Sequence, residues 1–178
     1  MKRILIVGAG GQIGSELTTY LRKIYGASNV VATDVRECGK LAEGGPFEVL
    51  NALDAKAMSS VVERYKIDAI FNLVALLSAV GEKNPQTAWN INIGALMNAL
   101  EVAREYGCAL FTPSSIGAFG PTSPKDKTPQ DTIMQPTTIY GVCKVTGELL
   151  GNYYFRRYGV DTLSLIHISE PTRRSYIS

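Results

Sequence analysis

The chain alternates short, mostly apolar runs with longer segments in which apolar residues recur every three or four positions. Short apolar runs are typical of parallel strands that are buried on both faces. We expect six strands, at Ile4–Val7, Val30–Thr33, Phe47–Leu50, Ala69–Leu73, Ala109–Thr112 and Thr162–Leu165. The longer segments predict four helices, at Gln12–Tyr25, Ala55–Tyr65, Pro85–Tyr106 and Thr138–Tyr158.

This alternation of strand and helix predicts βαβ units and a parallel sheet. The fold class is therefore α/β, a Rossmann-type doubly wound parallel sheet with helices on both faces. The segment Gly120–Pro136 is rich in Pro, Thr and Asp, and we expect a surface loop there beside the edge of the sheet. A loop of that length often serves a functional site.

The first predicted strand leads directly into a turn with regularly spaced glycines, Gly8, Gly11 and Gly14. In a strand–turn–helix context, the first glycine permits the tight turn, the second lets a pyrophosphate approach the backbone, and the third lets the helix pack closely on the strand. The N–H groups of Gln12 and Ile13, at the start of the helix, are then free to bind phosphate oxygens. The segment predicts a dinucleotide-binding site.

An acidic residue, Asp34, stands at the end of the second predicted strand. It follows Gly14 by about 20 residues, the spacing at which a carboxylate binds the adenosine ribose hydroxyls of NAD. The 2′-phosphate of NADP would be repelled by this carboxylate, although Arg36 would offset part of the repulsion. NAD is therefore favoured over NADP. A role as a turn former would explain the residue type of Asp34 but not its spacing.

Tyr140 and Lys144 stand four residues apart in a predicted helix and so share one face of it. A free tyrosine loses its proton near pH 10, so such a base works near neutral pH only where a cation stabilises the phenolate. Ser114 and Ser115 follow the fifth predicted strand, at the carboxyl end, where open α/β sheets bind ligands. Chance and ordinary turn chemistry explain each feature alone, but the combination with the glycine turn favours a catalytic centre.

Further segments carry a resemblance to a known family: Ala75–Glu82, Pro113–Pro124 and Thr138–Lys144. Together with the glycine turn, they make the chain similar to the extended short-chain dehydrogenases/reductases over about residues 2–161. Within that family the chain resembles the short-chain-type L-threonine 3-dehydrogenases, which are related to UDP-galactose 4-epimerase.

The resemblance implies a role for each matching residue. Tyr140 corresponds to the general acid/base, Lys144 to the residue that holds the nicotinamide ribose and activates the tyrosine, and Ser115 to the hydroxyl that binds the reacting oxygen. The substrate pocket would begin at Ser78 and Ser114. The other cofactor positions that it implies are Gly8, Gly11, Gln12, Ile13, Gly14, Asp34, Val35, Arg36, Asn51, Ala52, Val74, Ala75, Leu76 and Asn92.

Two of these cofactor positions have an alternative interpretation. Asn92 could equally be a polar group satisfied within the fold, and Asn51 stands where the wider family often has an aspartate. The resemblance further implies that the full-length protein is a homodimer that oxidises L-threonine to 2-amino-3-ketobutyrate with NAD. A nucleotide-sugar epimerase or dehydratase would share the same residues. A non-catalytic NAD(H)-binding module is a third alternative.

Composition limits the remaining function classes. The 178 residues are 46% hydrophobic and 19% charged, which suits the core of one domain. A net charge of +2 and the lack of a long apolar run argue against nucleic-acid and membrane partners. Three widely spaced cysteines, Cys38, Cys108 and Cys143, form neither a disulfide framework nor a metal-ligand pattern. We expect no metal and a reducing, cytoplasmic location.

The last residues depart from the family. Residues 165–178 resemble translated sequencing-adapter read-through, and we give their single histidine, His167, no catalytic role. We therefore expect an NAD-binding domain over residues 1–164 that includes the Ser and Tyr-x-x-x-Lys residues, followed by a tail outside the family. On this interpretation the chain is one half of a longer enzyme, lacks the substrate domain, and is inactive alone.

Overall fold

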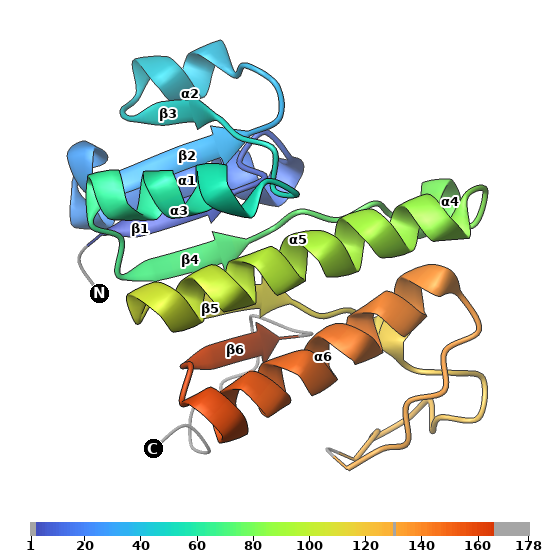
Figure 1. Cartoon of the computed structure of the whole chain (residues 1–178). Coiled ribbons are helices and arrows are strands. Elements are labelled where there is room, and N and C mark those ends of the chain that lie inside the picture. The colour runs from blue at the N-terminus through green and yellow to red at the C-terminus, as the bar shows by residue number, and fades with distance from the viewer. Residues whose placement is uncertain (1–2, 130, 166–178) are drawn as a thin grey trace.

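The computed structural model describes residues 3–129 and 131–165. Six strands form one sheet in the order β3-β2-β1-β4-β5-β6, and every neighbouring pair is parallel (Figure 1). This topology confirms the predicted doubly wound, Rossmann-type fold. The strands are β1 (Ile4–Val7), β2 (Val30–Asp34), β3 (Phe47–Val49), β4 (Ala69–Asn72), β5 (Ala109–Pro113) and β6 (Thr162–Leu165).

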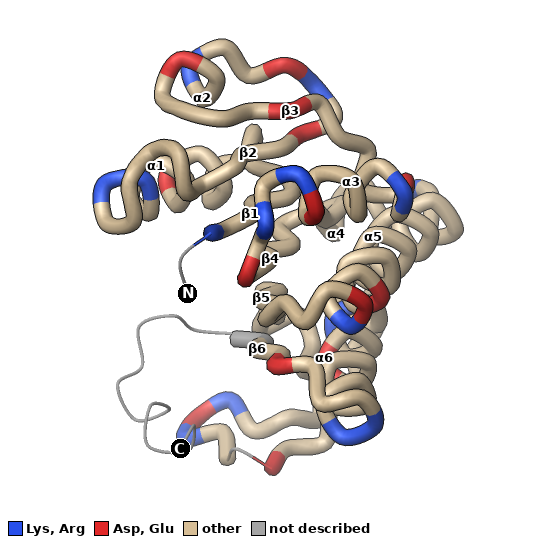
Figure 2. Tube along the Cα trace, turned by 60° about the vertical axis from the view of Figure 1, so that its left-hand side comes forward, with Lys and Arg blue, Asp and Glu red and all other residues tan. Residues whose placement is uncertain are grey.

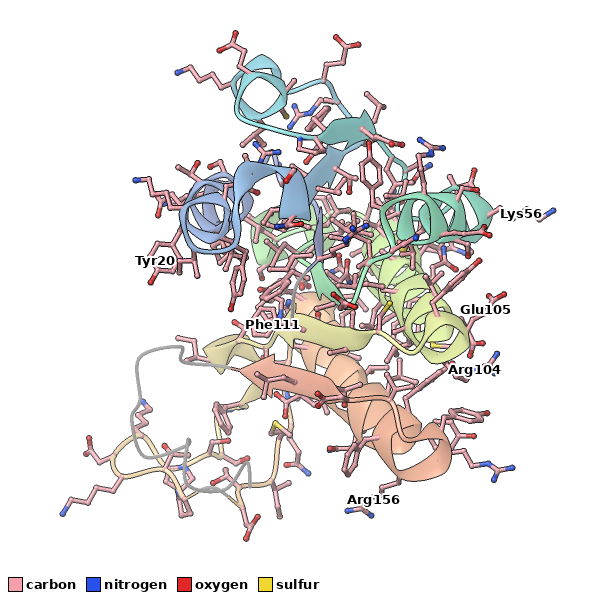
Figure 3. All side chains as sticks on the ribbon, turned by 90° about the vertical axis from the view of Figure 1, so that its left-hand side faces the viewer. Tyr20, Lys56, Arg104, Glu105, Phe111 and Arg156 are labelled. Carbon is pink, nitrogen blue, oxygen red and sulfur yellow. The ribbon has the colours of Figure 1, made fainter. Side chains whose placement is uncertain are left out.

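Helices cover both faces of the sheet, with α1 on one face and α3, α5 and α6 on the other (Figure 3). The face under α3, α5 and α6 holds the larger hydrophobic core, which includes Leu5, Ile70 and Leu110 from the strands. The helices are α1 (Gln12–Tyr25), α2 (Gly39–Glu43), α3 (Ala55–Tyr65), α4 (Ser78–Gly81), α5 (Pro85–Tyr106) and α6 (Ile139–Tyr158), with short 3-10 turns at η1 (Ala27–Asn29) and η2 (Ile116–Ala118).

The bounds of the long helices follow from their capping residues. Each of α3, α5 and α6 begins after a side chain whose oxygen accepts a backbone N–H of the first turn, and these caps are Asp54, Asn84 and Thr138. Helices α5 and α6 end at glycines in the left-handed conformation, Gly107 and Gly159.

The predicted bounds of α1, α3 and α5 are confirmed, and α6 begins one residue later than predicted because Thr138 is its cap. The predicted strands differ from the observed ones by at most one residue at an end. Helices α2 and α4 were not predicted, since segments of five and four residues are too short to show a helical period.

Basic residues (Lys and Arg) and acidic residues (Asp and Glu) are interspersed along the described chain (Figure 2). None of the helices in the described part is long and apolar enough to cross a membrane. Leu165 ends β6 and pairs with Pro113 of β5, whereas His167 and the rest of the predicted tail lie outside the described residues.

Candidate active site

The predicted site residues converge on the edge of the sheet formed by the carboxyl ends of β1, β2, β4 and β5, on the right in Figure 1. From β1 the chain runs outward to β2 and β3, and it then crosses back to β4 on the other side of β1. This reversal of strand order opens a crevice between β1 and β4, which is where open α/β sheets bind their ligands.

In the glycine turn, the fold requires glycine at two positions but not at a third. Gly8 has a φ of +85°, and a Cβ at Gly14 would lie 2.4 Å from the carbonyl oxygen of Gly8, so both must be glycine. At Gly11, by contrast, the only heavy atom near a Cβ would be the Gly8 oxygen at 3.5 Å, an ordinary contact. The missing side chain of Gly11 thus leaves room at the surface of the turn, where a pyrophosphate would approach.

The N-terminus of α1 is suited to an anion. Gly11 caps the helix without any side-chain hydrogen bond, and the first turn contains no acidic residue. Gln12 and Ile13 are exposed there, and the first N–H groups of a helix have no partner within the helix. These N–H groups and the helix dipole together favour a phosphate.

The carboxylate of Asp34 is fixed by two backbone N–H groups. Its Oδ2 accepts from Gly10 at 2.9 Å, and its Oδ1 accepts from Arg36 at 3.2 Å. A Cβ at Gly10 would lie 2.9 Å from Oδ2 and 2.8 Å from the Sγ of Cys38. Gly10 is therefore a site residue that the sequence reasoning missed. The run of adjacent glycines at 10 and 11 was the available signal.

Asn92 of α5 holds the segment that leaves β4. Its Oδ1 accepts from the Leu76 N–H at 2.6 Å, and its Nδ2 donates to the Leu76 carbonyl at 3.2 Å. Asn92 is therefore satisfied within the fold, and it fixes Leu76 at the crevice, whereas its role toward a cofactor stays a prediction.

Tyr140, Lys144 and Ser115 come together beside the end of β5. The Nζ of Lys144 donates to the Pro113 carbonyl at 2.7 Å and lies 5.4 Å from the centroid of the Tyr140 ring. Burial lowers the pKa of the Lys144 ammonium. A Cβ at Gly117 would contact both Ser115 Oγ and the Tyr140 ring at 3.4 Å, so the two side chains flank this glycine.

Other predicted positions make different contacts. Ser114 donates to the carboxylate of Glu148 on α6, so its hydroxyl is engaged within the fold. The exposed Asn51 accepts the N–H of Leu53 at 3.0 Å in a local turn. Ser78 begins α4, and α4 is tied to the start of α6 by a bond from the Ile139 N–H to the Glu82 carboxylate, just beyond α4.

No group of three or more His, Cys, Asp or Glu side chains within the described residues could hold a metal ion. The groups assembled at this edge are instead backbone N–H donors and one carboxylate at the glycine turn, with a hydroxyl, a phenol and an ammonium beside β5. Such a set can bind a dinucleotide and transfer a proton at a substrate oxygen.

Comparison with known proteins places this arrangement in a family. The model of the NAD dependent epimerase/dehydratase family matches residues 4–169, a few residues beyond the predicted domain boundary. A curated protein of Staphylococcus saprophyticus, described as an uncharacterized epimerase/dehydratase, is 55% identical over 96% of this chain and 56% of its own length.

Solved structures give the same picture. The L-threonine dehydrogenase of Clostridium difficile superposes with a TM-score of 0.90 and 50% identity, over 93% of this chain and 53% of that one. The UDP-glucose 4-epimerase of Thermotoga maritima superposes with a TM-score of 0.83 and 25% identity, over 92% and 54%. The chain thus spans about half the length of these relatives. From the family match over most of the sequence, we conclude that the chain belongs to the NAD dependent epimerase/dehydratase family.

Proposed function

We propose that the full-length protein oxidises the β-hydroxyl of L-threonine to give 2-amino-3-ketobutyrate, with NAD as its cofactor. The observation that carries the chemistry is the placement of Lys144, fixed on Pro113 and 5.4 Å from the Tyr140 ring. The choice of substrate is supported by likeness: the threonine dehydrogenase of C. difficile is 50% identical to this chain, against 25% for the T. maritima epimerase.

The residues at the glycine turn fit NAD. Gly11 leaves space for the pyrophosphate, the N–H groups of Gln12 and Ile13 would bind its oxygens, and Asp34 would accept the adenosine ribose hydroxyls. Val35 and Arg36 extend this ribose site, and Asn51 and Ala52 would face the adenine. On the nicotinamide side, Asn92 would hold Leu76 in place, next to Val74 and Ala75.

The proposed mechanism assigns one task to each catalytic residue. Tyr140 takes the proton of the substrate hydroxyl, and Ser115 hydrogen-bonds to the same oxygen. The ammonium of Lys144 stabilises the Tyr140 phenolate and would hold the nicotinamide ribose. NAD⁺, when bound, would be the oxidant that accepts the hydride from C3 of the substrate. Ser78 and Ser114 would lie at the beginning of the substrate pocket.

We also propose that the full-length protein is a homodimer that pairs α5 and α6 with their copies. Helix α6 presents Val142, Leu149 and Tyr153 at helical spacing, and Leu149 is 62% exposed.

The free cysteines Cys38, Cys108 and Cys143 suit a cytoplasmic location. The proposed domain comprises residues 1–164, and the proposed tail outside the family begins at Leu165, the last residue of β6. Resequencing the source gene beyond the codon for Ser164 tests that boundary.

The function is tested on the full-length protein by following NADH absorbance with L-threonine as the substrate. Tyr140→Phe should lower turnover by about 10²–10⁴-fold, the usual contribution of a general acid/base, while NAD affinity is retained. Tyr20→Phe is the matched control, because Tyr20 is exposed on α1, and it should leave turnover unchanged.

Other outcomes would identify the alternatives. Reaction with a UDP-sugar but not with threonine would show a nucleotide-sugar epimerase or dehydratase. NAD binding without turnover of either substrate class would indicate a binding module. Full threonine turnover in Tyr140→Phe would refute the assigned base.

A further inference from the structure

A tight turn, residues 51–54, lies between β3 and α3. We call it the adenine turn, because Asn51 and Ala52 are the positions proposed to face the adenine. The N–H of Asp54 donates to the Asn51 carbonyl at 2.9 Å, and the N–H of Leu53 donates to the Asn51 side chain at 3.0 Å. Both bonds lie within the turn, so they fix its shape but not its position relative to the rest of the site.

The two ends of the adenine turn are held by neighbouring elements. The N–H of Leu50, just before the turn, donates to the backbone carbonyl of Asp34 at 2.8 Å and so ties this end to β2. At the other end, the side chain of Asp54 caps α3 by accepting the N–H of Ala57 at 2.9 Å. The middle of the turn, at Ala52, therefore needs a support of its own.

Helix α5 supplies this support. The Nδ2 of Asn98 donates to the Ala52 carbonyl at 3.0 Å, across 46 positions of the sequence. A Cβ at Gly94, one helical turn before Asn98, would lie 3.0 Å from the Cδ2 of Leu53, so the backbone of α5 packs closely against the turn. Among the described residues, no other side chain from outside the turn donates a hydrogen bond to it.

The hydrogen bond to Ala52 is difficult to replace. Ala52 is only 7% exposed, so water has little access to this residue. If Asn98 no longer donated, the carbonyl would stay unpaired, or the turn would move until the carbonyl reached water. The first outcome destabilises the observed turn, and the second changes where Asn51 lies.

We propose that Asn98 is a positioning residue for the binding of adenine, which acts by holding the Ala52 carbonyl and so presetting the adenine turn beside Asp34. The inference rests on the NAD-binding part of the proposed function and not on threonine as the substrate. A turn that is ordered before binding costs the ligand less free energy, so this bond should contribute to the affinity for adenine nucleotides. The contribution should be specific for the base, because Asp34 and the glycine turn would bind the ribose and the phosphate.

Helix α5 would then support both ends of the dinucleotide site. Asn92 holds Leu76 after β4, and Asn98 holds Ala52 after β3. The two asparagines lie less than two turns apart on α5. One rigid helix therefore reaches two loops that follow different strands.

The first test uses this chain and two ligands that differ only in the base, adenosine 5′-monophosphate (AMP) and ribose 5-phosphate. In the native chain, the NMR signals of the backbone amides of residues 51–54 should respond to AMP and not to ribose 5-phosphate. In Asn98→Leu, which has a similar size but no donor, the affinity for AMP should fall by roughly tenfold, whereas the affinity for ribose 5-phosphate should stay within about twofold. Both affinities are measured by NMR titration.

The matched control is Asn90→Leu, the same change at an exposed position of the same helix, and it should leave both affinities unchanged. A merely structural role of Asn98 would lower the two affinities together or would lower stability alone, and either result would overturn the proposal. A native chain that does not bind AMP would overturn it as well.

If Asn98→Leu does not fold, Asn98→Asp decides the question. An ionised aspartate keeps the shape of the side chain but cannot donate a hydrogen bond. The same selective loss of AMP affinity is expected, and Asn90→Asp controls for the added charge. Unchanged AMP affinity in Asn98→Asp would overturn the proposal.

The second test uses the full-length protein. Asn98→Leu should raise the KM for NAD by roughly tenfold with little change in kcat, because the bond supports cofactor binding and not the transition state. A fall in kcat at an unchanged KM would contradict the proposal. If the full-length protein does not turn over threonine but Asn98→Leu still loses AMP affinity selectively, the proposed function fails and the role of Asn98 stands.

Discussion

The two halves of the candidate site are built in different ways. The cofactor half is made by one short stretch, residues 8–14, together with Asp34 at the end of the neighbouring strand. The catalytic half brings together side chains from β4, α5, β5 and α6, and its key contacts join residues far apart in sequence, such as Lys144 and Pro113.

This difference determines which amino-acid substitutions each half of the site tolerates. The glycine turn depends on backbone geometry, so a single added methyl group at a crowded position disrupts the conformation of the turn. The catalytic half depends on hydrogen bonds between elements, so the loss of one bond should change its geometry and stability only by a small amount. We therefore expect the largest effects of substitution at the turn and graded effects around α5 and α6.

The sharpest test of this difference is a pair of alanines in the turn. Gly14→Ala places a Cβ 2.4 Å from a backbone oxygen and 2.7 Å from the Cα of Ala9, so something in the turn must move. We expect a loss of more than about 3 kcal/mol in the free energy of unfolding, measured by chemical denaturation of this chain.

Gly11→Ala is the partner experiment. Gly11 has an extended conformation that alanine adopts readily, and its Cβ would meet only ordinary contacts. Stability should change by less than about 1 kcal/mol, while NAD affinity should fall by roughly tenfold or more because the methyl group occupies the space of the pyrophosphate. Equal losses of stability in the two variants would refute the distinction between them.

A smaller effect is expected in the catalytic half from Asn92→Leu. This change leaves the N–H and carbonyl of Leu76 without their partners. We expect the free energy of unfolding to fall by about 2 kcal/mol and NAD affinity to fall with it. Asn90→Leu, at an exposed position on the same helix, should stay within about 0.5 kcal/mol of the native chain. A native-like Asn92→Leu would show that Leu76 needs no support.

The smallest effect concerns the start of the helix that carries Tyr140. The hydroxyl of Thr138 accepts the N–H of Gly141 at 3.0 Å, so Thr138→Ala should cost about 1 kcal/mol of stability. Thr146→Ala serves as the control within α6, because alanine has the higher helix propensity there and should not destabilise the chain. If both variants lose the same stability, the cap makes no contribution of its own.

The cofactor half could be predicted from sequence because its signal is local. Gly8, Gly11 and Gly14 fall within one turn, and Asp34 lies at a fixed interval from them. For the same reason the long helices and all six strands were predicted nearly to the residue. The periodicity of each element is contained in its own segment.

The catalytic half was predicted only in part. The spacing of Tyr140 and Lys144 placed them on one helix face, but nothing local shows that Asn92 binds Leu76, or that Ser114 turns toward Glu148. These contacts depend on how α5 and α6 pack on the sheet. The bond from Asn98 to Ala52 depends on the same packing, so it too requires the structure.

One contact outside the site bears on the order in which the fold opens. The buried guanidinium of Arg22, on α1, donates to the carbonyls of Val30, Leu41 and Pro46, and so ties α1 to β2 and to the segment before β3. Its three partners all lie within 24 residues of it along the chain. In hydrogen exchange, the amides of α1 and of the segment from β2 to β3 should therefore open together as one cooperative unit.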